Sequence, residues 1–209
     1  MGWRAGQRGN GSSAASAPIR VICARGQSLA GERKGFIVAG VDSLTPHEAF
    51  CLRAAEGWLE LNNPAEAKAE LSQISPEFQG HPDVLSLRWH ICQRAKAWED
   101  CLVLARQLTE SSPNDPRGWI ALAQTHYYGQ QYEVAYDLAV SKITTFPRHW
   151  PLYYDSACYA CLTGRLDQAK QFLQLAMAFG DADSVRSRAV EDPDLATLWK
   201  EAGEAESEG

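Results

Sequence analysis

The chain has 209 residues, of which 45% are hydrophobic and 22% are charged, and its formal net charge is −6 at neutral pH. This composition is typical of a soluble protein of one or two domains, and no apolar run approaches the roughly 18 residues needed to cross a bilayer. Nucleic acid and anionic membrane are not expected as main partners, because phosphate groups are bound by clustered lysine and arginine.

The first 44 residues are predicted to form a flexible basic tail. Residues 1–47 have a charge balance of +4, which leaves −10 on the remainder of a chain whose total is −6. Glycine, serine and alanine dominate residues 5–17, a composition that favours a flexible chain. The lack of acidic residues before Glu32 also fits an organelle-targeting segment, although the glycines weaken any amphipathic helix. We therefore expect a cytoplasmic protein, with organelle targeting as the alternative.

From residue 45 to residue 183, similar residues recur at a fixed interval along the sequence. This interval is the separation in sequence between Pro64 and Trp98. Bulky landmarks recur at this interval, and small residues follow them three positions later. The landmarks are Pro64, Trp98, Tyr132 and Leu166, and the small residues are Ala67, Cys101, Ala135 and Ala169. A fixed period in the range of roughly 20–50 residues is typical of stacked units that cannot bury their apolar faces alone. Each unit has room for two helices of about 12–15 residues.

Helix-start signals fall at the boundaries of these units. Residues 45–48 and 63–66 each have the pattern of a capping box with proline at the first helical position. His81-Pro82 and Asp115-Pro116 stand where the second and third units begin. The agreement of these independent signals with the period strengthens the assignment of a helical repeat.

The repeated unit resembles the tetratricopeptide repeat (TPR). The matching residues are Trp119, Leu122, Ala123, Tyr132, Ala135, Ala139 and Pro147. In this register the repeats cover residues 48–81, 82–115, 116–149 and 150–183. The resemblance implies an all-α fold, a right-handed α-solenoid of about four TPR-like helix hairpins. Trp89 departs from the pattern at a position where the family has a small residue, so we expect distortion there or a ring that points elsewhere. Lys142 also departs, and Ile143 is expected to take the buried place.

Residues 184–202 are predicted to form a capping helix, and residues 203–209 an acidic tail. The apolar residues Val190, Leu195, Leu198 and Trp199 are placed to cover the last repeat, as the end of a solenoid requires. The run Asp-Pro-Asp-Leu at residues 192–195 resembles the segment that often closes TPR arrays.

The sequence gives little sign of catalytic or metal chemistry. Cys158 and Cys161 form the one CxxC pair, on one face of a predicted helix, without the second pair or histidines that a metal site needs. A redox pair is expected at the start of a helix, whereas these cysteines fall in the middle of one. The favoured interpretation is two small packed residues, so we expect no enzyme, metal or cofactor. A metal or redox protein built on this pair is the less favoured alternative.

The TPR resemblance implies that the first helix of each repeat lines an inner groove for an extended or helical segment of another protein. The groove positions that we expect to bind a partner are Arg53, Glu56, His90, Arg94, Arg117, Gln124, Tyr127, Tyr128, Tyr154 and Asp155. Tyrosines supply contact area, and charged side chains fix the position of a bound peptide along the groove. This mixture suits polypeptide recognition. The family's carboxylate clamp for chaperone tails is absent, since its positions include Leu52, Leu87 and Ala121.

The leading hypothesis is therefore a non-catalytic adaptor or scaffold that binds another protein. A dedicated chaperone for a secreted or assembling protein is the alternative within binding proteins. Self-association through an exposed end of the array is a further alternative.

Overall fold

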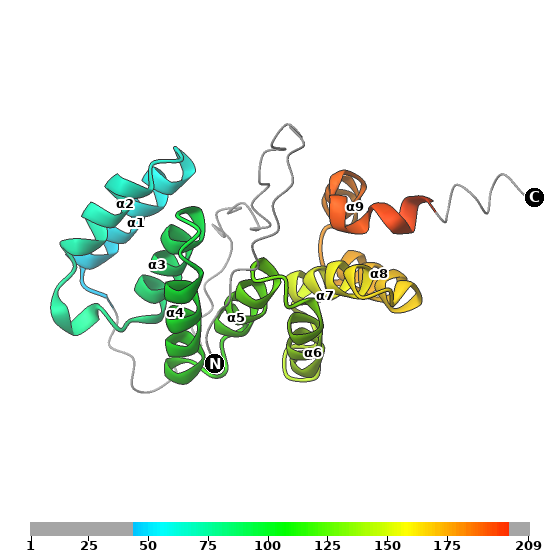
Figure 1. Cartoon of the computed structure of the whole chain (residues 1–209). Coiled ribbons are helices and arrows are strands. Elements are labelled where there is room, and N and C mark those ends of the chain that lie inside the picture. The colour runs from blue at the N-terminus through cyan, green and yellow to red at the C-terminus, as the bar shows by residue number, and fades with distance from the viewer. Residues whose placement is uncertain (1–43, 201–209) are drawn as a thin grey trace, which may run out of the picture. The chain divides into compact units, whose positions relative to one another are not determined.

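The computed structural model describes residues 44–200, which belong to one compact unit and form an all-α arrangement without strands (Figure 1). The α-helices are α1 (Pro46–Glu60), α2 (Pro64–Ser72), α3 (Pro82–Arg94), α4 (Trp98–Ser111), α5 (Pro116–Tyr128), α6 (Tyr132–Ile143), α7 (Trp150–Leu162), α8 (Leu166–Phe179) and α9 (Ala182–Glu191). Two 3-10 helices, η1 (Pro76–Phe78) and η2 (Pro193–Leu195), lie between α2 and α3 and after α9. The predicted basic tail up to residue 43 and the acidic tail lie outside the described residues.

The helices follow the period predicted from the sequence. Helices α3, α5 and α7 begin at Pro82, Pro116 and Trp150, and α2, α4, α6 and α8 begin at Pro64, Trp98, Tyr132 and Leu166, each one repeat period after the last. Successive helices from α1 to α8 pack against one another, and α1–α3, α3–α5 and α5–α7 are also in contact (Figure 1). The chain between residues 46 and 179 is therefore a series of helix pairs, each of which contacts the next.

None of the helices within residues 44–200 combines the length and the apolar character needed to cross a membrane.

Side chains cap the predicted helix starts in most cases. Asn63 accepts from the amide of Glu66 at 3.3 Å, and Asp115 accepts from the amide of Arg117 at 2.9 Å. The first capping box is different, because the Thr45 side chain makes no bond to the helix backbone. Its partner Glu48 is buried and instead contacts the hydroxyls of Thr45 and Ser75, the latter at 2.8 Å. Glu48 therefore ties α1 to the loop after α2.

A repeated turn joins the two helices of each pair. Near the end of each first helix one residue has a positive φ, at Asn62, Lys96, Gln130 and Gly164, again with the spacing of the repeat. The next residue donates its amide to a carbonyl five positions earlier, as from Asn63 to Trp58 at 2.8 Å and from Arg165 to Ala160 at 2.8 Å. This is the Schellman pattern, in which left-handed backbone satisfies the last carbonyls of a helix.

The small residues of the repeat are buried, and Trp89 is a large residue at a position that is otherwise small. Ala67, Cys101, Ala135 and Ala169 have no exposed surface. Trp89 is also buried, and its ring reaches the next pair, where Nε1 donates to Thr125 Oγ1 at 3.0 Å. We expected the Trp89 ring either to distort the second repeat or to point elsewhere, and it has a hydrogen-bond partner in the following repeat. Lys142 lies over the ring of Trp119 at 3.5 Å, and Ile143 packs against the core.

The C-terminal prediction of a single helix over residues 184–202 is wrong in detail. Helix α9 ends at Glu191, and η2 follows directly at Pro193. Pro193 lacks an amide proton and is incompatible with a continuing helix, so the chain turns there. Val185, Ala189, Leu195 and Leu198 are all buried in the same core as α7 and α8. The segment therefore covers the end of the array, but as α9, the 3-10 helix η2 and a further helical stretch at residues 196–200.

Two glycine substitutions should shift stability in opposite directions. Gly164 has φ +77°, so Gly164→Ala should lower the free energy of unfolding by about 1 kcal/mol. Gly57 lies inside α1, where an added Cβ meets nothing within 4 Å, so Gly57→Ala should raise it by roughly 0.5–1 kcal/mol. Urea unfolding of both variants checks this, and shifts of the same sign would contradict the assigned turn.

Candidate functional site

The predicted groove residues lie on α1, α3, α5 and α7, and their exposure differs from helix to helix. Arg53, Glu56 and Arg117 are exposed, His90, Arg94, Tyr127 and Tyr128 are half-buried, and Gln124, Tyr154 and Asp155 are buried. We call the side chains that these four helices contribute the first-helix surface. Its portion on α1, α3 and α5 is accessible apart from the buried Gln124, whereas its portion on α7 is covered.

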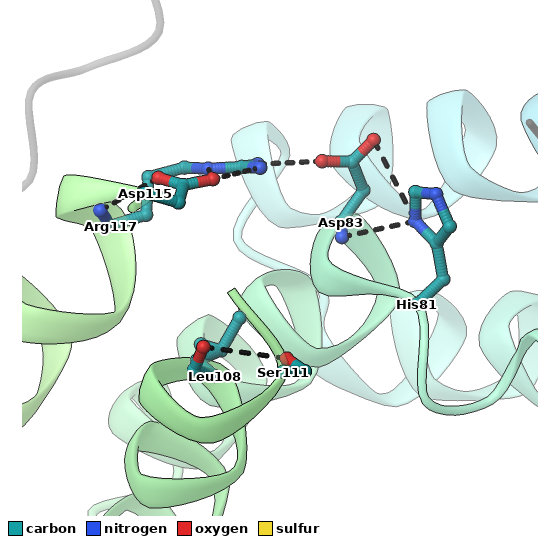
Figure 2. A network of polar contacts seen from close by, with 6 residues as sticks. All are labelled: His81, Asp83, Leu108, Ser111, Asp115 and Arg117. Atoms are coloured by element: carbon teal, nitrogen blue, oxygen red, sulfur yellow. Dashed lines mark hydrogen bonds and ion pairs between the residues drawn. The ribbon is translucent and has the colours of Figure 1, made fainter. Parts of the chain in front are cut away.

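Arg117 joins the second and third helix pairs through a carboxylate on each side (Figure 2). Its Nη1 lies 2.6 Å from Asp83 Oδ1, and its Nη2 lies 2.6 Å from Asp115 Oδ2. Burial alone would raise the pKa of Asp115, but the hydrogen bonds and charge of Arg117 outweigh it, so that pKa is lowered. Both carboxylates hold the guanidinium in place, which limits how freely Arg117 can reorient toward a ligand.

Figure 2 also shows how the neighbouring helix ends are tied down. His81 Nδ1 accepts from the amide of Asp83 at 3.2 Å and lies 3.9 Å from the Asp83 carboxylate. Ser111 Oγ donates to the carbonyl of Leu108 at 3.3 Å at the end of α4. The start of α3 is therefore fixed by His81 on one side and by Arg117 on the other.

The two predicted groove residues on α3, His90 and Arg94, have different electrostatic roles. Burial lowers the pKa of His90 to about 4, so its ring is neutral at physiological pH. Arg94 donates from Nη1 to Asn62 Oδ1 at 2.8 Å on an exposed part of the molecule. Arg94 rather than His90 therefore supplies positive charge on this helix.

The tyrosines of α5 are held by contacts within the protein. The ring of Tyr128 stacks on Trp98 with centroids 4.7 Å apart, and its hydroxyl accepts from Gln93 Nε2 at 2.7 Å. Tyr127 donates to Asp194 Oδ2 at 2.7 Å, and its ring lies 5.6 Å from that of Tyr159. Both rings contribute to packing between helix pairs, and a ligand would meet only their remaining exposed edges.

The covered portion lies under α9 and η2, which corrects the expectation that Gln124, Tyr154 and Asp155 line an open groove. Gln124 Nε2 donates to Asp155 Oδ2 at 2.9 Å, and the Tyr154 hydroxyl donates to Asp192 Oδ2 at 2.8 Å. The guanidinium of Arg188, on α9, lies 4.6 Å from the centre of the Tyr154 ring. Tyr154 is therefore engaged by the chain's own C-terminal residues, whereas Asp155 is bonded to Gln124 of α5.

The two cysteines of the CxxC pair are buried, and the first belongs to this same polar network. Burial, followed by the charges of Asp192 and Asp155, raises the pKa of Cys158 well above its usual range. The protonated thiol donates to Asp192 Oδ2 at 3.9 Å. The sulfur and the carboxylates of Asp192 and Asp194 lie within 4.8 Å of one another. Tyrosine hydroxyls and a backbone amide already donate to those carboxylates, which favours a hydrogen-bonded network within the fold.

A shallow hollow is found at the helix turns after α5 and α7. Its lining residues are Gln130, Gln131, Tyr132, Glu133, Val134, Leu162 and Thr163. None of the predicted groove residues lines it, so it gives no support to a small-molecule site on the first-helix surface.

Sequence reasoning missed the residues that cover α7. The sequence placed Asp192, Asp194 and Arg188 only in a predicted cap. The Asp-Pro-Asp-Leu run was the available signal, because it resembles the segment that closes TPR arrays. The sequence did not predict which groups these residues contact, because partners such as Tyr127 and Asp194 are 67 residues apart in the chain.

No protein-family model matches this chain, and no curated protein was found as a relative.

The Arg117 bridge can be tested with a conservative change. Arg117→Lys should lower the free energy of unfolding by about 0.5–1 kcal/mol, because an ammonium group cannot hold both carboxylates in this planar arrangement. The loss should shrink in high salt, since the groups are partly exposed. Arg106→Lys, at an exposed position on α4, is the matched control. An equal loss in both variants would show that the bridge contributes nothing.

Proposed function

We propose that this chain is a non-catalytic protein-interaction module, a TPR-like right-handed α-solenoid that binds a segment of a partner protein. The observation that carries the proposal is the recurrence of helix starts and left-handed turns at one and the same interval along the chain. Stacked helix pairs of this kind typically present their first helices as a continuous surface for an extended or helical peptide.

The partner segment is proposed to lie across α1, α3 and α5. Arg53 and Arg94 offer positive charge on α1 and α3, and Glu56 adds a negative group, while Arg117 is paired with Asp83 and Asp115. The edges of Tyr127 and Tyr128 supply aromatic area at the far end, next to the covered α7. Such an arrangement favours a polypeptide with charged and apolar side chains over nucleic acid or membrane.

The environments of the candidate nucleophiles and bases support a non-catalytic role. The Cys158 thiol is kept protonated by burial, and His90 is neutral and half-buried. His81 caps α3, and His126 Nδ1 is 2.7 Å from Gln131 Oε1 at the turn after α5. The free cysteines among the described residues fit a reducing compartment, and we place the protein in the cytoplasm.

A pair of charge-reversal variants of the full chain tests this proposal. Arg53→Glu with Arg94→Glu should reduce capture of the partner from native lysate by about tenfold or more, because two charges on the proposed surface are inverted. Lys68→Glu with Arg106→Glu changes two exposed cations on the second helices α2 and α4 and serves as the control. Quantitative mass spectrometry of the captured proteins supplies the measurement.

Loss of the same protein in both variants, or in neither, would contradict binding at α1, α3 and α5. Circular dichroism should show equal helicity in all samples. Capture of a second copy of this chain, confirmed by light scattering, would favour self-association over an adaptor role.

A further inference from the structure

Three carboxyl groups lie near one another where α7 packs against the C-terminal segment, which we define as residues 182–198. Asp155 comes from α7, Asp192 follows α9, and Asp194 belongs to η2. Asp155 is 5% exposed and Asp192 is 8% exposed, while Asp194 is half-buried. We call these three residues the carboxyl cluster. Like charges in such a space repel one another strongly, because little water is present to screen them.

Groups from α5, α7 and α9 face this cluster. They are Gln124 and Tyr127 from α5, Tyr154, Cys158 and Tyr159 from α7, and Arg188 from α9. Arg188 is the cation among them, and its charge favours the ionised form of Asp155. One arginine cannot balance three ionised carboxyl groups, so negative charge would be in excess at the cluster.

The hydrogen bonds distinguish Asp155 from the other two acids. Asp192 accepts from Tyr154, Cys158 and the amide of Asp194, and Asp194 accepts from Tyr127. These donors stabilise the two carboxylates of the segment. Within residues 44–200, the Asp155 carboxylate accepts from the Gln124 side chain alone, at 2.9 Å, and is the most enclosed of the three. Asp155 is therefore the place where a proton relieves the excess of negative charge.

The electrostatics of Asp155 agree with this geometry. Burial is the main cause that raises the pKa of Asp155, to about 7, and the neighbouring Asp192 and Asp194 add to it. Gln124 and Arg188 act in the opposite direction. The group therefore changes charge in the physiological range rather than several pH units below it.

We propose that the carboxyl cluster is a proton-dependent latch for the C-terminal segment. With a proton on Asp155, the segment stays closed over α7. When that proton is lost, the Asp155 charge faces Asp192 and Asp194, and release of the segment separates the charges and admits water. Opening would uncover Tyr154 and its neighbours on α7. The latch itself does not depend on the proposed function, but if a partner binds α1, α3 and α5, opening would extend the accessible surface to α7.

The direction of the pH effect follows from proton linkage. In the open state Asp155 meets water and returns toward the ordinary aspartate pKa of about 3.9. The closed state binds the proton more tightly, so closure is favoured at low pH and is lost as the pH rises toward 7. Between about pH 5.5 and about pH 8, the ratio of open to closed molecules should rise roughly thirtyfold.

Hydrogen exchange of the full chain measures this opening directly. Exchange rates at the two pH values are divided by the rates for unstructured peptide at the same pH, which gives protection factors. Protection of α9 and η2 should fall about thirtyfold from pH 5.5 to pH 8. Protection of α3 should stay nearly constant, because none of the groups that act on Asp155 or Asp194 comes from α3.

Two variants separate the latch from a general pH effect. Asp155→Asn keeps an oxygen for Gln124 but cannot ionise, so the pH dependence of α9 and η2 should vanish. Asp137→Asn removes an exposed carboxylate from α6 and should behave like the wild type. If Asp155→Asn fails to fold, Asp194→Asn removes one opposing charge and should reduce the fall in protection.

The proposal is overturned if α9 and η2 of the wild type have the same protection at both pH values. It is also overturned if Asp155→Asn retains the thirtyfold fall, or if α3 loses protection as much as α9 does. Because partner binding is not measured, failure of the latch and failure of the proposed interaction function remain distinct results.

Discussion

The close approach of helices at small side chains is the constraint on which the rest of the structure depends. Ala67, Cys101, Ala135 and Ala169 have no exposed surface, and each lies one repeat period from the next. A helix pair has too little apolar area to be stable alone, so its neighbours must come near enough to bury it. The small residues permit that approach, and interiors packed to this density tolerate little added volume.

Once the helix pairs are in contact, polar groups fix how one pair sits against the next. Asp83 and Arg117 occupy equivalent places in successive units, and the same holds roughly for Asn62 with Arg94. Trp89 contributes a buried bond to Thr125 in the following unit. Buried polar groups must find partners to avoid a desolvation penalty, so such bonds discriminate against shifted arrangements. At the C-terminal end, residues 182–198 cover the last helix pair. Their aspartates accept hydrogen bonds from α5 and α7, where a further repeat would otherwise pack.

The sequence was informative wherever a local rule applied. The period predicted the helix starts at Pro82, Trp98, Pro116 and Tyr132 because proline, capping residues and bulky landmarks repeat together. The left-handed turns were missed because Lys96 and Gln130 occupy positions where glycine is usual. The burial of Tyr154 and Asp155 was missed because it depends on a segment far along the chain. The position of a residue within the repeat predicts which face of a helix it lies on, but it does not predict whether another part of the chain covers that face.

The central claim is that the helix pairs are held at a distance which only small side chains permit. The most direct measurement is the free energy of unfolding of Ala135→Leu, with Val134→Leu at the exposed neighbouring position as the control. We expect Ala135→Leu to lower it by about 1–3 kcal/mol through overpacking and Val134→Leu to change it by less than about 0.5 kcal/mol. Equal stability of the two variants would contradict close packing at this position and, with it, the account of how the array is held together.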